Sequence, residues 1–459
     1  MTKEYYVNPI SVTSQFYFCP IPLRLDTYSG CTNNCIYCFA NNSKQKIMNN
    51  KDIQEIKERC GIFNNSIVKP TKLEYVKKYF DIAFEGKKNT FKNQEALAID
   101  LLKRKVPIHF GGMSDGFQPV EKYFKISLEV LKLLKKYNYP LIISTKCKLI
   151  IEDEYYEILK DYDNVGIQVS LIDNRQEVAN IIEPGLGKNS VKDRFDILDK
   201  YKDKWTAVRI QPFIIYLTED IINEYLEELK KHNINHIVIE GLKFVNSNND
   251  MNYKISNAFK IITGKSFNLL KYYKSIGAKV SGNDVELPSW RKEQYLNKIK
   301  KKCNELGITF GAADNDLRLM GDNPCCCGNK DMPGMDNVCK YNIGFATFRA
   351  YEKYKKNNDY NITLSEIEKE IKLNGTIRLI MNKEKLKLKL GENNYKDACI
   401  SIDKLFMEQW NNCGKNSPCQ HFFVKKSNNF DKNGNLIYKF KTSEELEEER
   451  LMNKQKTLF

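Results

Sequence analysis

The chain of 459 residues has no long uninterrupted apolar run, and its longest ones, VGIQVSLI and IQPFIIYL, have the length of a strand. A membrane-spanning helix needs roughly 20 apolar residues, so we expect no such helix. The first residues, MTKEYYVNPI, lack the basic stretch and apolar stretch of a secretory signal. No internal repeat is found beyond the alternation of strands and helices described below. These absences predict a cytoplasmic protein.

The composition favours a folded protein with a metal or redox role. Hydrophobic residues make up 42% of the chain, which is enough for a core. The 14 cysteines are not expected to form a disulfide framework in a reducing compartment, and their clustering indicates metal or redox use. The net charge of +15 favours polyanionic partners. Lys and Asn are abundant throughout the chain, however, as a compositional bias of the source genome would also produce.

Six short apolar runs alternate with amphipathic helical segments. Runs that are apolar on both faces are typical of parallel strands covered by helices. The helical segments include residues 120–137 and 218–232, the second with Thr218 as its expected N-cap. Six such units predict an α/β fold, a complete or partial (β/α)6 parallel barrel with its active site at the carboxyl ends of the strands. The predicted strands are LRLD (23–26), PIHFGG (107–112), PLIIST (140–145), VGIQVSL (165–171), AVRIQPF (207–213) and HIVIEG (236–241).

The remaining segments are interpreted as additions to this barrel. Residues 43–105 insert about two helices before the second strand. After the barrel, a basic helix, RKEQYLNKIKKKCNELG, leads to a strand-like ITFGAAD and to the cysteine-rich NPCCCGNKDMPGMDNVC. A small α+β unit follows, with a helix opened by a capping box at Thr363, a hairpin of HFFVKK with NLIYKF, and a charged terminal helix. The predicted domains are 1–285, 286–345 and 346–459.

The stretch SGCTNNCIYCFANN follows the first strand and places Cys31, Cys35 and Cys38 in a C-x3-C-x2-C pattern, with Tyr37 before the last cysteine. Thiolates bind zinc and iron–sulfur clusters. A structural zinc site needs four ligands, yet the next His or Cys is Cys60. A four-iron cluster held by three thiolates leaves one iron open to a small molecule. The alternatives are a zinc knuckle or three free thiols on a loop.

This pattern resembles the motif of the radical S-adenosylmethionine superfamily. The resemblance implies a [4Fe–4S] cluster whose open iron is chelated by S-adenosylmethionine, one-electron cleavage to a 5′-deoxyadenosyl radical, and hydrogen abstraction from a substrate. It also implies an electron donor such as flavodoxin or ferredoxin. The phrases HFGGMSDGFQP, STKCKLIIEDEYY and IIEPGLGKNSVKDRFDIL look like the branch that includes spore photoproduct lyase. This resemblance covers residues 20 to 245.

The resemblance also implies a set of cofactor-binding residues. Gly111 and Gly112 would bind the amino group of S-adenosylmethionine through the backbone, since a close approach leaves no room for a side chain. Met113 stands where the superfamily commonly has Glu, so the contact falls to the main chain, Ser114 or Asp115. Each candidate also has a structural alternative: a solvated charge, a strand-end hydroxyl or a surface ion pair. The other candidates around the cofactor or the substrate are Tyr37, Lys146, Ser170, Glu183, Arg194 and Gln211.

No residue is assigned a catalytic role. The photoproduct lyase returns a hydrogen atom through a cysteine of its own, and this chain shows no clear counterpart. Cys147, after the third predicted strand, is interpreted as a small buried hydrophobe, and His109 as a core residue. Repair of thymine dimers is therefore not implied.

A second group of cysteines follows the predicted barrel. Neighbouring side chains in an extended segment point to opposite sides, so three adjacent cysteines do not easily reach one metal. Two of them, with Cys339 and one later cysteine, could hold an auxiliary iron–sulfur cluster. They could instead bind structural zinc or remain reduced thiols. The group consists of Cys325, Cys326, Cys327 and Cys339, and the later cysteines are Cys399, Cys413 and Cys419.

The leading hypothesis is a radical S-adenosylmethionine enzyme. A nucleic acid or nucleobase is the first substrate expected, because of the branch resemblance and the positive charge. A peptide or protein is the main alternative, because cysteine-rich extensions are frequent in peptide-modifying members. A third hypothesis is a non-enzymatic metal-binding module that docks on nucleic acid through its basic surface.

Overall fold

The computed structural model describes most of the chain. Cys60, Cys339 and the predicted helix beyond residue 364 lie outside the described residues. Among the residues described, no helix is both long and apolar enough to cross a membrane. The described ranges are 5–13, 15–16, 18–40, 68–245, 249–281, 284–328, 331–335, 343–358, 360–364, 378–380, 399–413 and 417–455.

The centre of the molecule is a sheet that contains all six predicted strands. These six strands pair in parallel in sequence order, which confirms the predicted parallel α/β fold. Its strands, in sheet order, are β1 (Ile10–Val12), β2 (Leu23–Leu25), β3 (Ile108–Phe110), β4 (Leu141–Thr145), β5 (Val165–Ser170), β6 (Thr206–Phe213), β7 (His236–Gly241) and β11 (Thr309–Ala312). β1 and β11 are separate edges, so the barrel is partial.

The sheet has one more strand at each edge than the sequence predicts. β1 lies antiparallel to β2. β11 lies parallel to β7, with Thr309 opposite His236. β11 is the strand-like ITFGAAD, which the prediction separates from the barrel because a long segment with helices intervenes. The division into three domains stays a prediction, but the sheet itself continues beyond residue 285.

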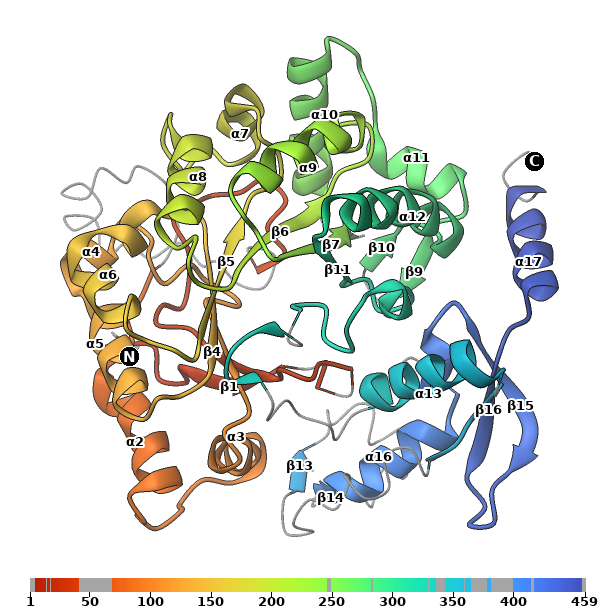
Figure 1. Ribbon diagram of the computed structural model, residues 1–459, viewed down its shortest axis with the longest axis horizontal. Helices are drawn as coiled ribbons and strands as arrows, with labels where there is room; N and C mark the ends of the chain where they lie inside the picture. The colour runs from red at the N-terminus through yellow and green to blue at the C-terminus, as the bar shows by residue number, and fades with distance from the viewer. Residues whose placement is uncertain are drawn as a thin grey trace.

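Helices cover the outside of the sheet, as Figure 1 shows. The strands they cover are apolar on both faces: every residue of β4 is buried, and so are the first five of β5. The helices are α2 (Leu73–Phe84), α3 (Asn93–Lys103), α4 (Glu121–Phe124), α5 (Ile126–Lys136), α6 (Asp153–Leu159), α7 (Gln176–Ile182), α8 (Ser190–Lys200), α9 (Ile222–Lys231), α10 (Asn249–Thr263), α11 (Leu269–Ser275) and α12 (Ser289–Leu306). The short 3-10 helices are η2 (Lys148–Ile151), η3 (Glu219–Ile221) and η4 (Arg318–Met320).

Two predicted helices differ in detail from the structure. The segment 120–137 breaks at Lys125, whose φ of 50° is left-handed. The buried Glu121 carboxylate then accepts hydrogen bonds from the amides of Ser127 and Leu128 and so caps the new helix α5. The predicted N-cap role of Thr218 is wrong. Thr218 is itself in a helical conformation, its hydroxyl has no hydrogen-bond partner among the described residues, and a 3-10 turn precedes α9.

The C-terminal unit packs beside the barrel in Figure 1. The predicted hairpin is confirmed, since β15 and β16 pair antiparallel, and so is the terminal helix. A further small sheet, β8-β10-β9, lies between the barrel and α12 in the chain. The elements are β8 (Phe244–Val245), β9 (Lys279–Ser281), β10 (Asp284–Glu286), α13 (Ile343–Asn357), β12 (Asn361–Ile362), β13 (Arg378–Ile380), β14 (Cys399–Ser401), α16 (Ile402–Asn411), η8 (Pro418–Gln420), β15 (Val424–Phe430), β16 (Leu436–Phe440) and α17 (Ser443–Gln455).

Candidate active site

The loop that carries Cys31, Cys35 and Cys38 follows β2, at the carboxyl ends of the parallel strands. It is held in place by the segment after α7. The amide of Ile36 donates to the carbonyl oxygen of Ile182 at 3.0 Å. The amide of Gly185 donates to the carbonyl oxygen of Asn33, also at 3.0 Å. The loop is therefore fixed to a part of the chain about 150 residues away in sequence.

Gly185 is required for this contact. A Cβ atom at this position would lie 2.3 Å from the carbonyl oxygen of Thr32 and 2.5 Å from the carbonyl carbon of Asn33. Both are backbone atoms, so a side chain could be accommodated only if the cysteine loop moved. This gives a physical reason for the glycine in the phrase IIEPGLG.

The phrase SDGFQP supports the loop from the other side. The Gln118 side chain is fully buried; its Oε1 accepts from the amide of Thr32 at 2.9 Å, and its Nε2 donates to the carbonyl oxygen of Gly30 at 2.9 Å. Asp115 Oδ2 accepts from Asn33 Nδ2 at 3.3 Å and from the amide of Lys146 at 2.7 Å. Asp115 therefore links the cysteine loop to the end of β4. Sequence reasoning noted the phrase but missed this role.

Cys35 is close enough to both Cys31 and Cys38 for their charges to interact. Burial raises the pKa of Cys35 to about 12, although the charge of Lys146 acts to lower it, and the nearby Cys38 and Glu183 add to the rise. Burial also raises the pKa of Cys31, with further contributions from Asp115 and Cys35. The thiolate form, which binds metals, is therefore costly here without a positive partner such as a metal centre.

Four of the predicted residues meet in one buried network behind the loop. Glu183 is 2% exposed and accepts a hydrogen bond from the Tyr37 hydroxyl. Lys146 Nζ lies 2.7 Å from Glu183 Oε1 and 3.1 Å from the Tyr37 oxygen. Arg194 Nη1, on the other side, lies 2.6 Å from Glu183 Oε2. The alternatives of a solvated lysine and a surface ion pair are therefore wrong.

The Glu183 carboxylate is held ionised between two cations. Burial alone would raise its pKa, but Arg194 and Lys146 outweigh that effect and lower the pKa to about 2. Arg194 is itself fully buried and also donates to the carbonyl oxygens of Ser190 at 2.9 Å and Ser170 at 3.1 Å. Ser170 thus joins the network through its backbone.

The predicted glycine pair follows β3, next to the cysteine loop. Gly111 has a φ of +81°, and a Cβ there would lie 2.6 Å from the carbonyl oxygen of Ser144. Beyond it, the amides of Met113 and Ser114 donate to Asp26 Oδ1 at 2.8 and 3.1 Å. The Met113 side chain is 38% exposed, and its sulfur accepts from Arg24 Nη1 at 3.2 Å.

The remaining candidates have their polar groups in contact with the protein. The Ser114 hydroxyl donates to the carbonyl oxygen of Tyr28 at 2.8 Å. The Gln211 side chain accepts from Arg209 Nε, two residues earlier in β6. Cys147 is 8% exposed, and its sulfur lies 3.6 Å from Asn33 Oδ1, which places this thiol beside the cysteine loop.

A polar layer crosses the middle of the barrel below these residues. His109 Nε2 lies 2.6 Å from the Ser144 hydroxyl, which donates to Gln168 Oε1 at 2.9 Å. Burial, with the positive charges of Arg209 and Arg24, lowers the pKa of His109 to about 3, so the ring is neutral at pH 7. Sequence reasoning missed Ser144 and Gln168, because single polar residues in apolar strands give no signal of a shared layer.

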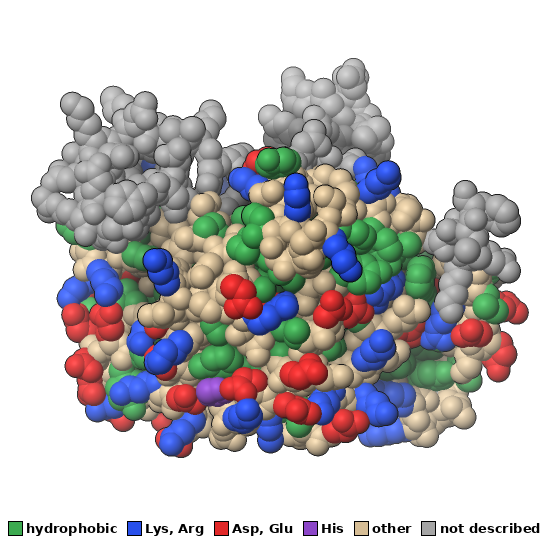
Figure 2. Space-filling model, turned by 90° about the horizontal axis from the view of Figure 1, so that it is seen from above, with side chains coloured by type: hydrophobic (Ala, Val, Ile, Leu, Met, Phe, Trp, Pro, Cys, Tyr) green, Lys and Arg blue, Asp and Glu red, His purple; other side chains and the backbone are tan. Residues whose placement is uncertain are grey.

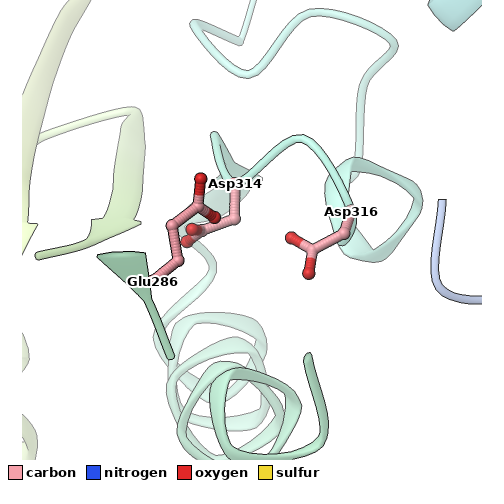
Figure 3. Close-up of side chains that lie close together, drawn as sticks. All are labelled: Glu286, Asp314 and Asp316. Carbon is pink, nitrogen blue, oxygen red and sulfur yellow. The ribbon is translucent and has the colours of Figure 1, made fainter. Parts of the chain in front are cut away.

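Three carboxylates, Glu286, Asp314 and Asp316, gather beyond β11 (Figure 3). A lysine already occupies the centre of this group. Lys292 Nζ lies 3.2 Å from Glu286, 3.3 Å from Asp314 and 2.7 Å from Asp316. The group is therefore a buried ion-pair network between β10 and α12, and its cation is an ammonium group.

The later cysteines follow the prediction only in part. Cys413 and Cys419 form a disulfide, so in this structure neither is a free ligand for a metal. This corrects the expectation that either could complete an auxiliary site. Cys325, Cys326 and Cys327 are free thiols.

Comparisons with known proteins find a likeness among solved structures. No protein-family model matches the chain, and no curated protein matches its sequence. Three solved structures of spore photoproduct lyase resemble it at a TM-score of 0.42 each. A cysteine-to-alanine variant with dinucleoside spore photoproduct is 12% identical, and the match covers 63% of this chain and 75% of that one.

A double variant with bound AdoMet and dinucleoside spore photoproduct is 11% identical, with 64% and 78% of the two chains covered. A tyrosine-to-phenylalanine variant is 12% identical, with 65% and 79% covered. The enzyme that the sequence motifs resemble is thus found again among solved structures, as a distant likeness that says nothing about activity.

Proposed function

We propose that the chain is a radical S-adenosylmethionine enzyme. One observation carries the proposal. A loop with three thiols is fixed at the carboxyl ends of a parallel partial barrel, against a buried network of Tyr37, Lys146, Glu183 and Arg194. Active sites of parallel α/β barrels lie at this end of the strands.

The donor set fits an iron–sulfur cluster. Cys31, Cys35 and Cys38 would hold it, because thiolates are its usual protein ligands and three of them leave one iron free for S-adenosylmethionine. When bound, the cluster supplies the electron that cleaves S-adenosylmethionine and so generates the radical that abstracts hydrogen. Lys146 adds a positive charge next to Cys35, which favours the thiolate form that binding requires.

The other residues are proposed to bind and position the cofactor. The backbone at Gly111 and Gly112 would receive the amino group of S-adenosylmethionine, since these residues have no side chain in the way. The next residue, Met113, has an uncharged side chain that could not pair with the amino group. Ser114 and Asp115 act as positioning residues, because their side chains already bond to the protein. Ser170, Glu183, Arg194 and Gln211 would shape the floor and the wall of the cofactor site.

A nucleobase or nucleic acid is the first substrate we propose, on the strength of the net charge of +15 and the motif resemblance. On the face in Figure 2, basic and acidic side chains are interspersed and form no single basic patch. Binding of an oligonucleotide should weaken steeply as salt rises, because phosphate contacts release counterions. An oligonucleotide that does not bind even at low salt would favour a peptide or protein substrate.

The direct test uses protein purified and reconstituted without oxygen. We expect iron, labile sulfide and formation of 5′-deoxyadenosine when S-adenosylmethionine and a reductant are added. Cys35→Ala should abolish 5′-deoxyadenosine formation. Cys303→Ala is the matched control, because Cys303 is a buried thiol of α12 outside the site. Formation of 5′-deoxyadenosine by Cys35→Ala would refute the proposal, and zinc without sulfide would favour the non-enzymatic metal-binding module.

A further inference from the structure

A second group of thiols lies at the opposite end of the barrel. A separate core cluster fills the amino-terminal mouth, where it includes Ile142 near the start of β4, Ala207 near the start of β6, and Met332. Cys325 is part of this cluster, and Cys19 and Cys327 pack against it. Cys19 comes from the segment before β2, about 300 residues earlier in the chain, and sequence reasoning did not consider it.

The turn with the three adjacent cysteines is pressed against the inside of the strands. A Cβ on Gly311 of β11 would lie 2.0 Å from the carbonyl oxygen of Cys326. His236, the first residue of β7, places its Nε2 2.8 Å from the same oxygen. The backbone of the turn is therefore fixed at the amino ends of β7 and β11.

Three of the four cysteines share one core cluster, and Cys326 lies between two of them in the turn. The side chains of Cys325 and Cys327 are both close enough to that of Cys326 to influence it. Cys19 is close enough to Cys326 for the charge of that thiolate to affect it. The turn thus overcomes the alternation expected for an extended segment, and three adjacent side chains converge.

Two arginines supply positive charge at this place. The charges of Arg318 and Arg209 both act on Cys326, and that of Arg318 also acts on Cys19. Arg318 is 8% exposed, yet its Nε has no hydrogen-bond acceptor among the described residues. Its Nη1 donates to the carbonyl oxygen of Phe18 and its Nη2 to the side-chain oxygen of Gln15, and both residues belong to the segment that leads to Cys19. An anionic sulfur centre would satisfy this buried donor.

We propose that Cys19, Cys325, Cys326 and Cys327 form a thiolate-ligated metal site at the amino-terminal mouth of the barrel. Four thiolates are the ligand set of iron–sulfur clusters and of structural zinc, and the two arginines offset the negative charge that such a centre carries. The site joins two segments distant in sequence, so its metal fixes the cysteine turn to the segment before β2. The proposal is independent of the function proposed for the other end of the barrel.

The test removes the first site and measures the second. The background variant is Cys31→Ala/Cys35→Ala/Cys38→Ala, reconstituted without oxygen with iron and sulfide, and in a separate sample with zinc. We expect it to retain iron with labile sulfide, or zinc, in stoichiometric amount. Adding Cys19→Ala should lower the retained metal at least fivefold, and adding Cys326→Ala should do the same.

Adding Cys303→Ala to the same background is the control and should leave the metal content unchanged. Far-UV circular dichroism of each variant shows whether it is folded; the two substituted cysteines, Cys19 and Cys326, are both partly exposed. Iron with sulfide identifies a cluster, and zinc alone identifies a zinc site. A folded background variant that retains neither, or metal content unaffected by Cys19→Ala, would overturn the proposal.

Discussion

The two ends of the barrel present cysteines in different ways. At the carboxyl ends of the strands, three thiols come from one short loop, which two distant segments hold through Gln118, Asp115 and Gly185. At the amino ends, thiols come from two segments about 300 residues apart, and no regular spacing connects them. The first arrangement is visible in the sequence as a spacing, whereas the second exists only once the chain is folded.

The ends also differ in their buried charge. Behind the carboxyl-end loop, an anion, Glu183, lies between the cations Lys146 and Arg194. At the amino end, Arg318 and Arg209 lie near thiols. The cations at the carboxyl end thus share a carboxylate partner, whereas Arg318 and Arg209 form no ion pair with a carboxylate among the residues that the structure describes. The following predictions test this contrast.

The largest effect is expected from Glu183→Ala. Removing the anion leaves Lys146 and Arg194 without their carboxylate, and breaking a buried ion pair in this way costs about 3–5 kcal/mol. We expect urea unfolding to show this loss, and 5′-deoxyadenosine formation to fall with it. Glu85→Gln, which alters an exposed ion pair of α2, should leave the unfolding midpoint unchanged. An unchanged midpoint in Glu183→Ala would contradict the described network.

The second-largest effect is expected from Gly185→Ala, which should disturb the cysteine loop at the carboxyl ends of the strands and leave the thiols at the amino ends unaffected. Because the added Cβ meets the backbone of Thr32 and Asn33, the cysteine loop must move, and we expect at least a tenfold loss of 5′-deoxyadenosine formation. Lys188→Ala is the control, since this residue of the same loop has an exposed side chain. Metal retained by Cys19 and Cys325–Cys327 should not change. Equal activity of the two alanine variants would show that the loop does not need this contact.

Gln118→Ala should have a smaller effect on the same loop. The substitution removes the acceptor that Gln118 offers to the amide of Thr32 and the donor that it offers to the carbonyl oxygen of Gly30, and a lost hydrogen bond to a buried group costs about 1–3 kcal/mol. We expect lower stability in urea and faster loss of iron to a chelator. The amide-bearing variant Gln118→Asn should fall between wild type and Gln118→Ala. Chelator kinetics identical to wild type would argue against the clamp.

The smallest effect is a dependence of stability on pH. The pKa of His109 is about 3 in the folded state and about 6.5 when unfolded. The unfolded state therefore binds more protons below pH 6.5, and stability falls as the pH drops from 6.5 towards 3. His109→Gln should flatten part of this slope in urea titrations at pH 7, 6, 5 and 4. The buried residues His421, whose pKa is also about 3, and His236, whose pKa burial also lowers, should keep their own part of the slope. An unaltered slope would contradict the neutral buried ring.

Much of the fold could be predicted, because buried parallel strands appear in the sequence as apolar runs, which can be counted. All six expected strands are present with their bounds within two residues. β1 is not predicted, and β11 is predicted as a strand but not as part of the sheet, because it lies far from β7 in the chain. The break at Lys125 depends on the side chain of Glu121 as a cap, and Thr218 failed as a cap because a 3-10 turn replaced the expected first turn.

The candidate site, like the fold, could be predicted only in part. Cys31, Cys35, Cys38 and Tyr37 are visible because their spacing is local. Lys146, Glu183 and Arg194 could be named by resemblance, but their mutual contact is a property of the fold. The support of the loop by Gln118 and Gly185, and the approach of Cys19 to Cys326, depend on long-range packing that no local pattern encodes.

The most direct test of the account is the response of the reconstituted iron–sulfur centre to S-adenosylmethionine, measured by electron paramagnetic resonance of the reduced protein. If three thiolates leave one iron free, adding S-adenosylmethionine should change the spectrum, and the change should be absent in Cys35→Ala and retained in Cys303→Ala. A wild-type spectrum that does not respond to S-adenosylmethionine would contradict the open site on which the proposed function depends.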